Sequence, residues 1–211
     1  MKRFYIFIIQ YYNSNRMAKK IYLLASLVSI MMAIVSTACG NTSSTKTEKV
    51  DGVEWNVSLR KTVQFNDSLT GVSTYNIYTV ADTASVNEKL LSIKPENLTL
   101  DWSLPSTDGT IWLVAYESEP ILSEKVSVTE ANSIPDYNGD IQIGFKFSDA
   151  EKWATITRKN IGKRLAIFVN GQLMNAPQVN NVIESGYCSV SIPANMVTDF
   201  LPNLDIEKIK H

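Results

Sequence analysis

The chain has 211 residues, enough for one ordinary domain or two small ones, and its 45% apolar content is typical of a globular protein. Residues 1–38 contain five basic residues and no acidic one, so the remainder holds 15 basic and 21 acidic residues, a net charge of −6. This acidic balance argues against a nucleic-acid partner, because phosphate contacts need a basic surface.

The N-terminal segment has the pattern of a bacterial secretion signal. Lys19 and Lys20 precede an apolar run from Ile21 to Val35, about as long as the core of a signal peptide. Small residues occupy positions 36–38, and Cys39 follows them directly. This order resembles the lipobox of bacterial lipoproteins, in which the cysteine is diacylated and becomes the first residue of the mature protein.

We expect Met17 to be the true first residue, because residues 1–16 place a second apolar patch ahead of the signal pattern. A plain transmembrane anchor is the alternative, but the apolar run is short for a span of about 20 residues. We therefore predict that residues 1–38 are a signal peptide. Residues 39–50 would then hold the lipidated Cys39 and a Ser/Thr-rich polar tether.

The next part of the chain predicts mainly strands. A nearly continuous apolar run at 110–116 indicates a central strand that is covered on both faces. A short helix is expected at 85–93, where Ser85 and Glu88 have the spacing of a capping box, and a short helical turn is expected at 127–131. Period-two alternation and β-branched residues predict further strands at 53–59, 61–69, 72–80 and 98–104.

The C-terminal half carries the clearest local signals. A half-buried strand at 141–147 leads into a helix with Ser148 as its N-cap and Gly162 as the left-handed residue that ends it. Asn170–Gly171 predicts a type I′ hairpin turn. Further strands are predicted at 165–169, 172–175 and 187–192, and short helical pieces at 195–201 and 205–210.

Together these elements predict an α+β fold, with a mostly antiparallel sheet and one main packed helix at Ser148–Ile161. We expect residues 51–108 to form a β-rich region and residues 109–211 an α+β region, joined in one compact unit. Cys188 has no disulfide partner if Cys39 is lipidated, and its apolar flanks predict a buried strand residue rather than a reactive thiol.

One stretch of this half resembles a known family. Residues Asn160–Pro177 read NIGKRLAIFVNGQLMNAP, which is similar to the signature N-x-G-K-x-L-A-I-x-x-D-G-x-x-x-x-A-P of SecD, a membrane subunit of the bacterial protein-export machinery. The signature lies in the head part of the first large extracytoplasmic domain of SecD. The resemblance covers about residues 112–200 and does not extend to residues 50–105. It implies a ferredoxin-like, SecD-head-like fold in the C-terminal half.

The residues of this motif are expected to serve the fold rather than chemistry, because they fall where a helix ends, a strand begins and a hairpin turns. The family has aspartate where this chain has Asn170, which is neutral for the turn. SecD also has membrane-spanning helices with acidic residues, and we expect none after Cys39. The matched positions are Asn160, Gly162, Lys163, Asn170, Gly171, Ala176 and Pro177.

The sequence lacks the patterns of the common catalytic triads, zinc sites and phosphate-binding loops. His211 is the single histidine, so Ser–His–Asp or Cys–His catalysis and a zinc site are not expected. We predict no cofactor and no metal. Residues 136–140, DYNGD, lack the spacing of a calcium loop and predict a solvated turn. Asp101 and Asp108 are the only candidates near apolar strands for a carboxylate pair.

The sequence therefore favours a non-enzymatic lipoprotein of the cell envelope, held at a membrane by its N-terminal lipid. Its head-like module would bind exported or envelope polypeptides, by strand addition at a sheet edge or in an apolar groove. Two alternatives stay open. A small-ligand-binding or structural lipoprotein predicts a deep apolar pocket. A carboxylate-dependent hydrolase of envelope polymers predicts two acidic side chains that face each other.

Overall fold

The computed structural model describes residues 46–74, 76–93, 98–133 and 139–209, which belong to one compact unit, Ser43–His211. The predicted signal peptide, Cys39 and most of the predicted turn at 136–140 lie outside the described residues. Within those ranges, no helix is both long enough and apolar enough to cross a membrane.

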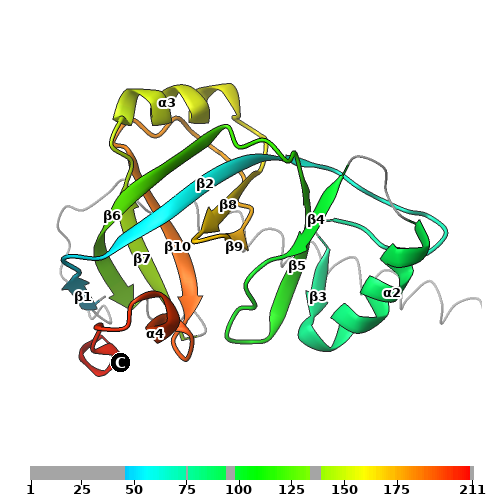
Figure 1. The fold of residues 1–211 in the computed structure, drawn as a ribbon, viewed down its shortest axis with the longest axis horizontal. Helices are drawn as coiled ribbons and strands as arrows, with labels where there is room; N and C mark the ends of the chain where they lie inside the picture. The colour runs from blue at the N-terminus through cyan, green and yellow to red at the C-terminus, as the bar shows by residue number, and fades with distance from the viewer. Residues whose placement is uncertain (1–45, 75, 94–97, 134–138, 210–211) are drawn as a thin grey trace, which may run out of the picture. The chain divides into compact units, whose positions relative to one another are not determined.

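The described part is rich in strands and has few helices, and every strand pairing in it is antiparallel, as predicted (Figure 1). The strands are β1 (Lys46–Lys49), β2 (Glu54–Val63), β3 (Ile77–Thr79), β4 (Thr99–Trp102), β5 (Thr110–Tyr116), β6 (Leu122–Ser133), β7 (Asp140–Lys146), β8 (Leu165–Val169), β9 (Gln172–Asn175) and β10 (Tyr187–Pro193). The helices are α2 (Thr83–Ile93), α3 (Ala150–Lys159) and α4 (Val197–Phe200), with single 3₁₀ turns η2 at Val80–Asp82 and η3 at Ile206–Lys208.

The long strand β2 connects all the other parts of the sheet (Figure 1). One edge of Glu54–Leu59 pairs with β6, and the other edge pairs with β8 through Val57–Lys61. Thr62 and Val63 then pair with β5, which is itself flanked by β3 and β4. Residues from the N-terminal region thus supply a central strand to the sheet of the C-terminal region.

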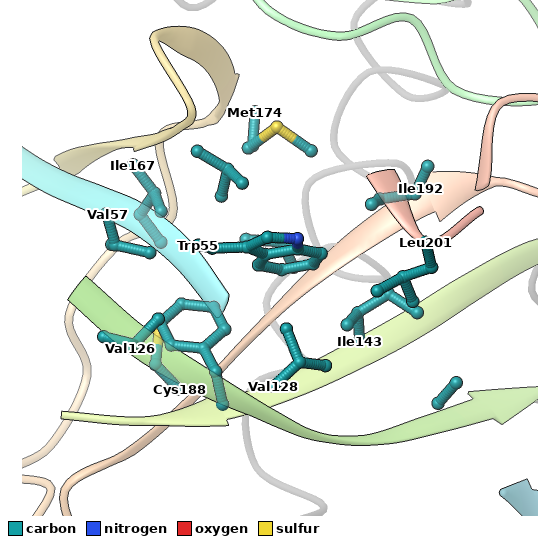
Figure 2. Packing of buried hydrophobic residues seen from close by; sticks show 14 of the residues in the cluster. Trp55, Val57, Val126, Val128, Ile143, Ile167, Met174, Cys188, Ile192 and Leu201 are labelled. Carbon is teal, nitrogen blue, oxygen red and sulfur yellow. The ribbon is translucent and has the colours of Figure 1, made fainter. Parts of the chain in front are cut away.

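The main core lies on one face of the six strands β9, β8, β2, β6, β7 and β10, and the two end strands, β9 and β10, lie close to each other. Trp55 of β2 sits in the middle of this core, 1% exposed (Figure 2). Its ring makes edge contacts with Phe145 and with Phe200, and its Nε1 donates a hydrogen bond to the Phe200 carbonyl at 3.2 Å. Burial raises the pKa of Cys188, also in this core, to about 12, as expected of a buried strand residue.

Two smaller clusters cover the two faces of β5, which confirms the central strand predicted at 110–116. Leu113 packs with Val72 and with Val86 of α2. On the other face, Tyr116 packs against Phe168 of β8. A strand that is buried on both faces carries apolar residues without alternation, as this one does.

The last part of the predicted tether is a strand rather than a linker. β1 pairs with Glu130–Ser133 of β6, on the same edge that β2 uses farther along. β6 has 12 residues and extends beyond the start of β2, so its backbone groups there need another partner. Residues 46–49 satisfy these groups. Directly after β1, the Val50 N–H donates a hydrogen bond to the Thr129 carbonyl at 3.1 Å, which continues the pairing by one residue.

The helical turn predicted at 127–131 is wrong, because these residues lie in the middle of β6. The register between β6 and β7 shifts between Val128 and Glu130, which marks a bulge. The bulge interrupts the period-two alternation, so the sequence loses its strand signal at that point. Thr129, within the bulge, donates from its hydroxyl to the Gly144 carbonyl at 3.1 Å.

The separate strands predicted at 61–69 and 72–80 are also largely wrong. Asp67 organises a turn instead, because its side chain accepts hydrogen bonds from the N–H and the hydroxyl of Thr70, both at 2.8 Å. Only Ile77–Thr79 of the second segment pairs as a strand. The capping box is formed at Thr79 and Asp82, ahead of α2, and not at the predicted pair.

Helix α3 is the predicted main helix, shortened by two residues at each end. Asp149 rather than Ser148 is its N-cap, and its side chain accepts from the Lys152 N–H at 2.8 Å. Ser148 instead donates its N–H to Glu124 of β6 at 2.8 Å. The buried residues Trp153 and Thr157 face the sheet, as the helical spacing predicts.

Candidate functional site

The first motif residues form the C-terminal end of α3. The Asn160 side chain donates to the Ile156 carbonyl at 2.8 Å, and so satisfies one of the carbonyls that a helix end leaves open. Gly162 has φ +79°, the left-handed conformation predicted for the residue that ends this helix. Three residues before Asn160, the buried Thr157 hydroxyl accepts from the Ile183 N–H at 3.1 Å and ties the helix to the segment before β10.

The two ends of the motif lie side by side. Gly162 donates its N–H to the Val179 carbonyl at 2.8 Å, and Val179 donates back to the Lys163 carbonyl at 2.9 Å. The Leu165 N–H reaches the Pro177 carbonyl at 3.1 Å. These backbone bonds fix the position of the loop between α3 and β8. The Arg164 guanidinium is held against it, with Nη1 2.8 Å from the Ala176 carbonyl and Cζ 5.9 Å from the Trp112 ring centroid.

Asn170 and Gly171 lie at the other end of the β8–β9 hairpin, as the turn residues that were predicted. Their φ angles of +50° and +86° are those of a type I′ turn. The Asn170 side chain has a further role, because its Oδ1 accepts from the Asn56 N–H at 2.9 Å, and its own N–H donates to the Asn56 carbonyl at 2.8 Å. The turn is therefore hydrogen-bonded to Asn56 of β2, a residue that lies outside the motif.

We expect Asn170→Ala to lower the free energy of unfolding by about 1–2 kcal/mol, from one lost hydrogen bond and a less tolerated positive φ. Asn170→Asp keeps an acceptor oxygen for the Asn56 N–H and tolerates the turn, so a change within about 0.5 kcal/mol is expected. Urea unfolding of the two variants gives both values. Equal losses for alanine and aspartate would show that the acceptor oxygen does not matter.

An open depression of about 490 Å³ lies next to the loop between α3 and β8. It falls within the range of about 300–1,000 Å³ that is usual for ligand sites. Its lining is polar and charged, unlike the apolar pocket that a small-ligand lipoprotein predicts. The motif contributes Asn160, Gly162, Lys163 and neighbouring Arg164, and the remaining lining residues are Lys61, Thr62, Gln64, Glu117 and Gln178.

Positive charge predominates in this depression, because three basic side chains and one carboxylate line it. The carboxylate, Glu117, already pairs with Lys61 at 3.5 Å, and both side chains are about half exposed. Lys163 is exposed, and its ammonium has no hydrogen bond or ion pair in the part of the chain that the structure describes. Lys163 therefore presents a positive charge on the surface of this depression.

The sequence did not single out Lys61, Thr62, Gln64 or Glu117. They come from the end of β2, from the residue after it and from the residue after β5. They reach the motif because β2 pairs with both β8 and β5. Their residue types alone carry no signal, since exposed lysine and glutamate are ordinary on any surface. The Thr62 hydroxyl donates to the Arg164 carbonyl at 2.9 Å, which links the end of β2 to the residue before β8.

The two aspartates considered for a hydrolase are engaged in separate structural contacts. Asp108 accepts from the Ser106 hydroxyl at 2.6 Å and the Thr110 N–H at 3.0 Å, in the turn between β4 and β5, and these hydrogen bonds lower its pKa. Asp101 accepts from the Tyr116 hydroxyl at 2.5 Å. Burial, followed by this bond to Asp101, raises the Tyr116 pKa. This arrangement gives no support to paired-carboxylate catalysis.

A second surface feature lies around α2 and β3. Of the large apolar side chains that are exposed within the described ranges, four fall in this small region, and Leu69 is 95% exposed. β3 and β4 each pair with β5 on one edge and with no other described strand. The four apolar residues are Leu69, Ile77, Val80 and Leu91.

The part of the chain that holds the motif is similar to known proteins. The family model described as "SecDF, P1 head subdomain" matches residues 103–198. The protein translocase subunit SecD of Sebaldella termitidis is 36% identical over 74 residues, 34% of this chain and 18% of that protein. The SecDF subunit of Thermus thermophilus is 35% identical over 69 residues, 32% of this chain and 9% of that protein.

The chain thus spans less than a fifth of the length of these relatives. A solved structure of SecDF, described as a membrane component that enhances protein export, aligns with 66% of this chain and 56% of its own at 20% identity, with a TM-score of 0.32. The resemblance seen in the motif is confirmed. The family match begins at Ser103 and leaves β2 outside it. Residues 103–198 of this chain form a SecD-like head domain.

Proposed function

We propose that this chain is a non-catalytic envelope protein that binds polypeptides in protein export or envelope protein handling, through its SecD-like head domain. The match of residues 103–198 to the SecDF head carries this proposal. The relatives it matches are named as subunits of protein translocases. The chain would act outside the cytoplasm, beside the translocation machinery and exported chains.

Two surfaces could contact an extended polypeptide. The depression beside Lys163 offers polar side chains that can hydrogen-bond to a peptide backbone, among them Gln178 and Thr62. The region of α2 and β3 offers exposed apolar side chains and sheet edges open to strand addition. Both are the kinds of contact that an unfolded chain can satisfy and a folded protein largely cannot.

A binding assay tests this function. The full chain, purified in nonionic detergent micelles, is titrated into a fluorescently labelled envelope protein, held unfolded in one sample and folded in the other. Binding to the unfolded form at micromolar concentration, with the folded form at least about tenfold weaker, is the expected result. Absence of binding to both forms would rule the function out.

We also propose that Cys39 carries the lipid that holds the protein at the membrane, with residues 1–38 removed as a signal peptide. The small residues before Cys39 support this. Cys39→Ser should abolish incorporation of a labelled fatty acid and move the protein from the membrane fraction to the soluble fraction. Unchanged labelling in the serine variant would refute lipidation at this residue.

A further inference from the structure

We propose that Arg60, on the face of the sheet opposite the main core, binds a side-chain carboxylate of a partner polypeptide. The proposal rests on the proposed function and deepens it by naming the chemistry of the bound segment. Ser58 and Arg60 of β2 and Ser123 of β6 make up this surface, which we call the Arg60 site. It is separate from the depression beside Lys163, whose lining includes none of these three residues.

The Arg60 site lies on the solvent side of β2 and β6. Successive side chains of a strand point to opposite faces, so Ser58 and Arg60 point away from the core that Leu59 enters. On β6, the exposed Ser123 lies directly opposite Ser58. Cα atoms of opposed residues are about 4.5–5.5 Å apart, and those of next-but-one residues in a strand about 7 Å. The three residues are therefore close neighbours.

Arg60 is the arginine of the described ranges whose N–H groups have no acceptor. By contrast, Arg158 pairs with Glu184 at 3.1 Å, and Arg164 donates to the Ala176 carbonyl at 2.8 Å. Within those ranges the Arg60 guanidinium makes no hydrogen bond or ion pair, and its Nε is buried without a partner. An arginine that is partly withdrawn from water usually has an anionic partner. Here a ligand can supply that anion to the outer nitrogens.

Two aromatic rings hold the Arg60 guanidinium in place. Its Cζ lies 5.3 Å from the ring centroid of Phe168 and 5.5 Å from that of Tyr116, and the two rings contact each other edge to face at 5.0 Å. These contacts engage the π electrons of the rings and leave the N–H donors without acceptors. A guanidinium fixed in this way loses little freedom on binding, and its planar fork matches the two oxygens of a carboxylate.

The neighbours of Arg60 favour an anion as the ligand. The hydroxyls of Ser58 and Ser123 make no hydrogen bond to any residue in the described part of the chain, so both can donate to the same carboxylate. Asp101 is a nearby carboxylate of the chain itself, but it accepts from the Tyr116 hydroxyl at 2.5 Å and forms no ion pair with Arg60. The charge of Arg60 is thus available to a ligand.

A single carboxylate matches this site better than the phosphates of a membrane surface do. The site holds one cation, and Lys125, farther along the same face, is paired with Glu54 and adds no net charge. A phosphate group is usually bound by several cations or by a helix N-terminus. Because lipid phosphates carry the same sign of charge as a carboxylate, anionic vesicles belong in the test.

The test uses the full chain in nonionic detergent micelles and two short fluorescent peptides, one rich in aspartate and the other with asparagine at the same positions. We expect the aspartate peptide to bind at least about threefold more tightly, and added salt to reduce that preference. Arg60→Gln should remove the preference by weakening the aspartate peptide about three- to tenfold. Arg60→Lys keeps the charge but not the fork, and should restore part of the affinity.

Further variants control for folding and for charge in general. Ser58→Ala and Ser123→Ala each remove a hydroxyl that has no partner in the described ranges, so both should fold and should weaken the aspartate peptide about twofold. They decide the question if Arg60→Gln does not fold. Arg158→Gln is the matched control, because it removes an exposed arginine of α3 and should change neither peptide.

The outcomes separate the two proposals. Equal affinity for the two peptides, or equal losses from Arg60→Gln and Arg158→Gln, would overturn the carboxylate site and leave polypeptide binding intact. Binding of the unfolded envelope protein but of neither peptide would do the same. Binding of none of the three would overturn both proposals. If Arg60→Gln reduces binding to phosphatidylglycerol vesicles but not to the aspartate peptide, the site recognises lipid headgroups and the inference is wrong.

Discussion

Replacing Trp55 with alanine is expected to lower the free energy of unfolding by about 3–5 kcal/mol, a large part of the roughly 5–15 kcal/mol that holds an ordinary domain together. The indole fills the centre of the main core (Figure 2). Its ring contacts those of Phe145 and Phe200, with centroid distances of 6.0 and 6.3 Å. Alanine would leave a cavity there and would leave the Phe200 carbonyl without its donor.

Urea unfolding followed by circular dichroism measures this loss. Trp55→Phe keeps most of the apolar contact but not the hydrogen bond, so a smaller loss of about 1–2 kcal/mol is expected, and this variant stays measurable if the alanine protein does not fold. Leu69→Ala, at a residue that is 95% exposed, should change stability by less than about 0.5 kcal/mol. A Trp55→Ala loss below about 1 kcal/mol would contradict the packing described.

Gly144→Ala is expected to cost about 1–3 kcal/mol, although one methyl group is all that it adds. Every other glycine in the described ranges has a positive φ, so Gly144 is needed for space rather than for backbone conformation. The Tyr187 ring lies across it. A Cβ at this position would lie 2.9 Å from Cε2 and Cζ of Tyr187, and closer still to the hydroxyl oxygen.

The Tyr187 ring crosses β7 because its hydroxyl is bonded to a residue of the strand beyond. From β10 the Tyr187 hydroxyl reaches over β7 and donates to Glu130 of β6 at 2.9 Å. Burial, followed by the bond to this carboxylate, raises the tyrosine pKa and keeps the hydroxyl protonated as a donor. A larger residue at position 144 would push the ring away and break a bond that links three strands.

A double-mutant cycle separates this clash from other effects of the alanine. In a Tyr187→Ala background, Gly144→Ala has no ring to meet, and its cost should fall to about 0.5 kcal/mol or less. Equal costs of Gly144→Ala in both backgrounds would mean that the tyrosine ring does not set the requirement for glycine. Urea unfolding of the four proteins supplies all the values.

The local features of the C-terminal half could be predicted from the sequence because each depends on neighbouring residues. The left-handed Gly162 and the Asn170–Gly171 turn follow from residue type and position, and the strands at 165–169 and 172–175 were placed correctly. The family resemblance came from the same stretch. The motif residues have structural contacts here, and their expected role in the fold stays a prediction.

The pairing partners could not be predicted, because they depend on contacts far apart along the chain. A strand was predicted at 53–59, but nothing near these residues indicates that β2 lies between β6 and β8. β8 lies more than 100 residues farther along the chain. The bulge near Thr129 removed the alternation that would have identified β6. The depression was missed for the same reason, since Lys61 and Glu117 join the motif only through these pairings.

The central claim is that the surface beside Lys163 contacts polypeptides during export, and site-specific photocrosslinking in living cells tests it most directly. A photoreactive amino acid is placed at position 163 in one protein and at position 49 in another. The account predicts that position 163 crosslinks to exported polypeptides while export is active, and that position 49 does not. Equal crosslinking at the two positions, or none at position 163 in cells that are exporting protein, would contradict it.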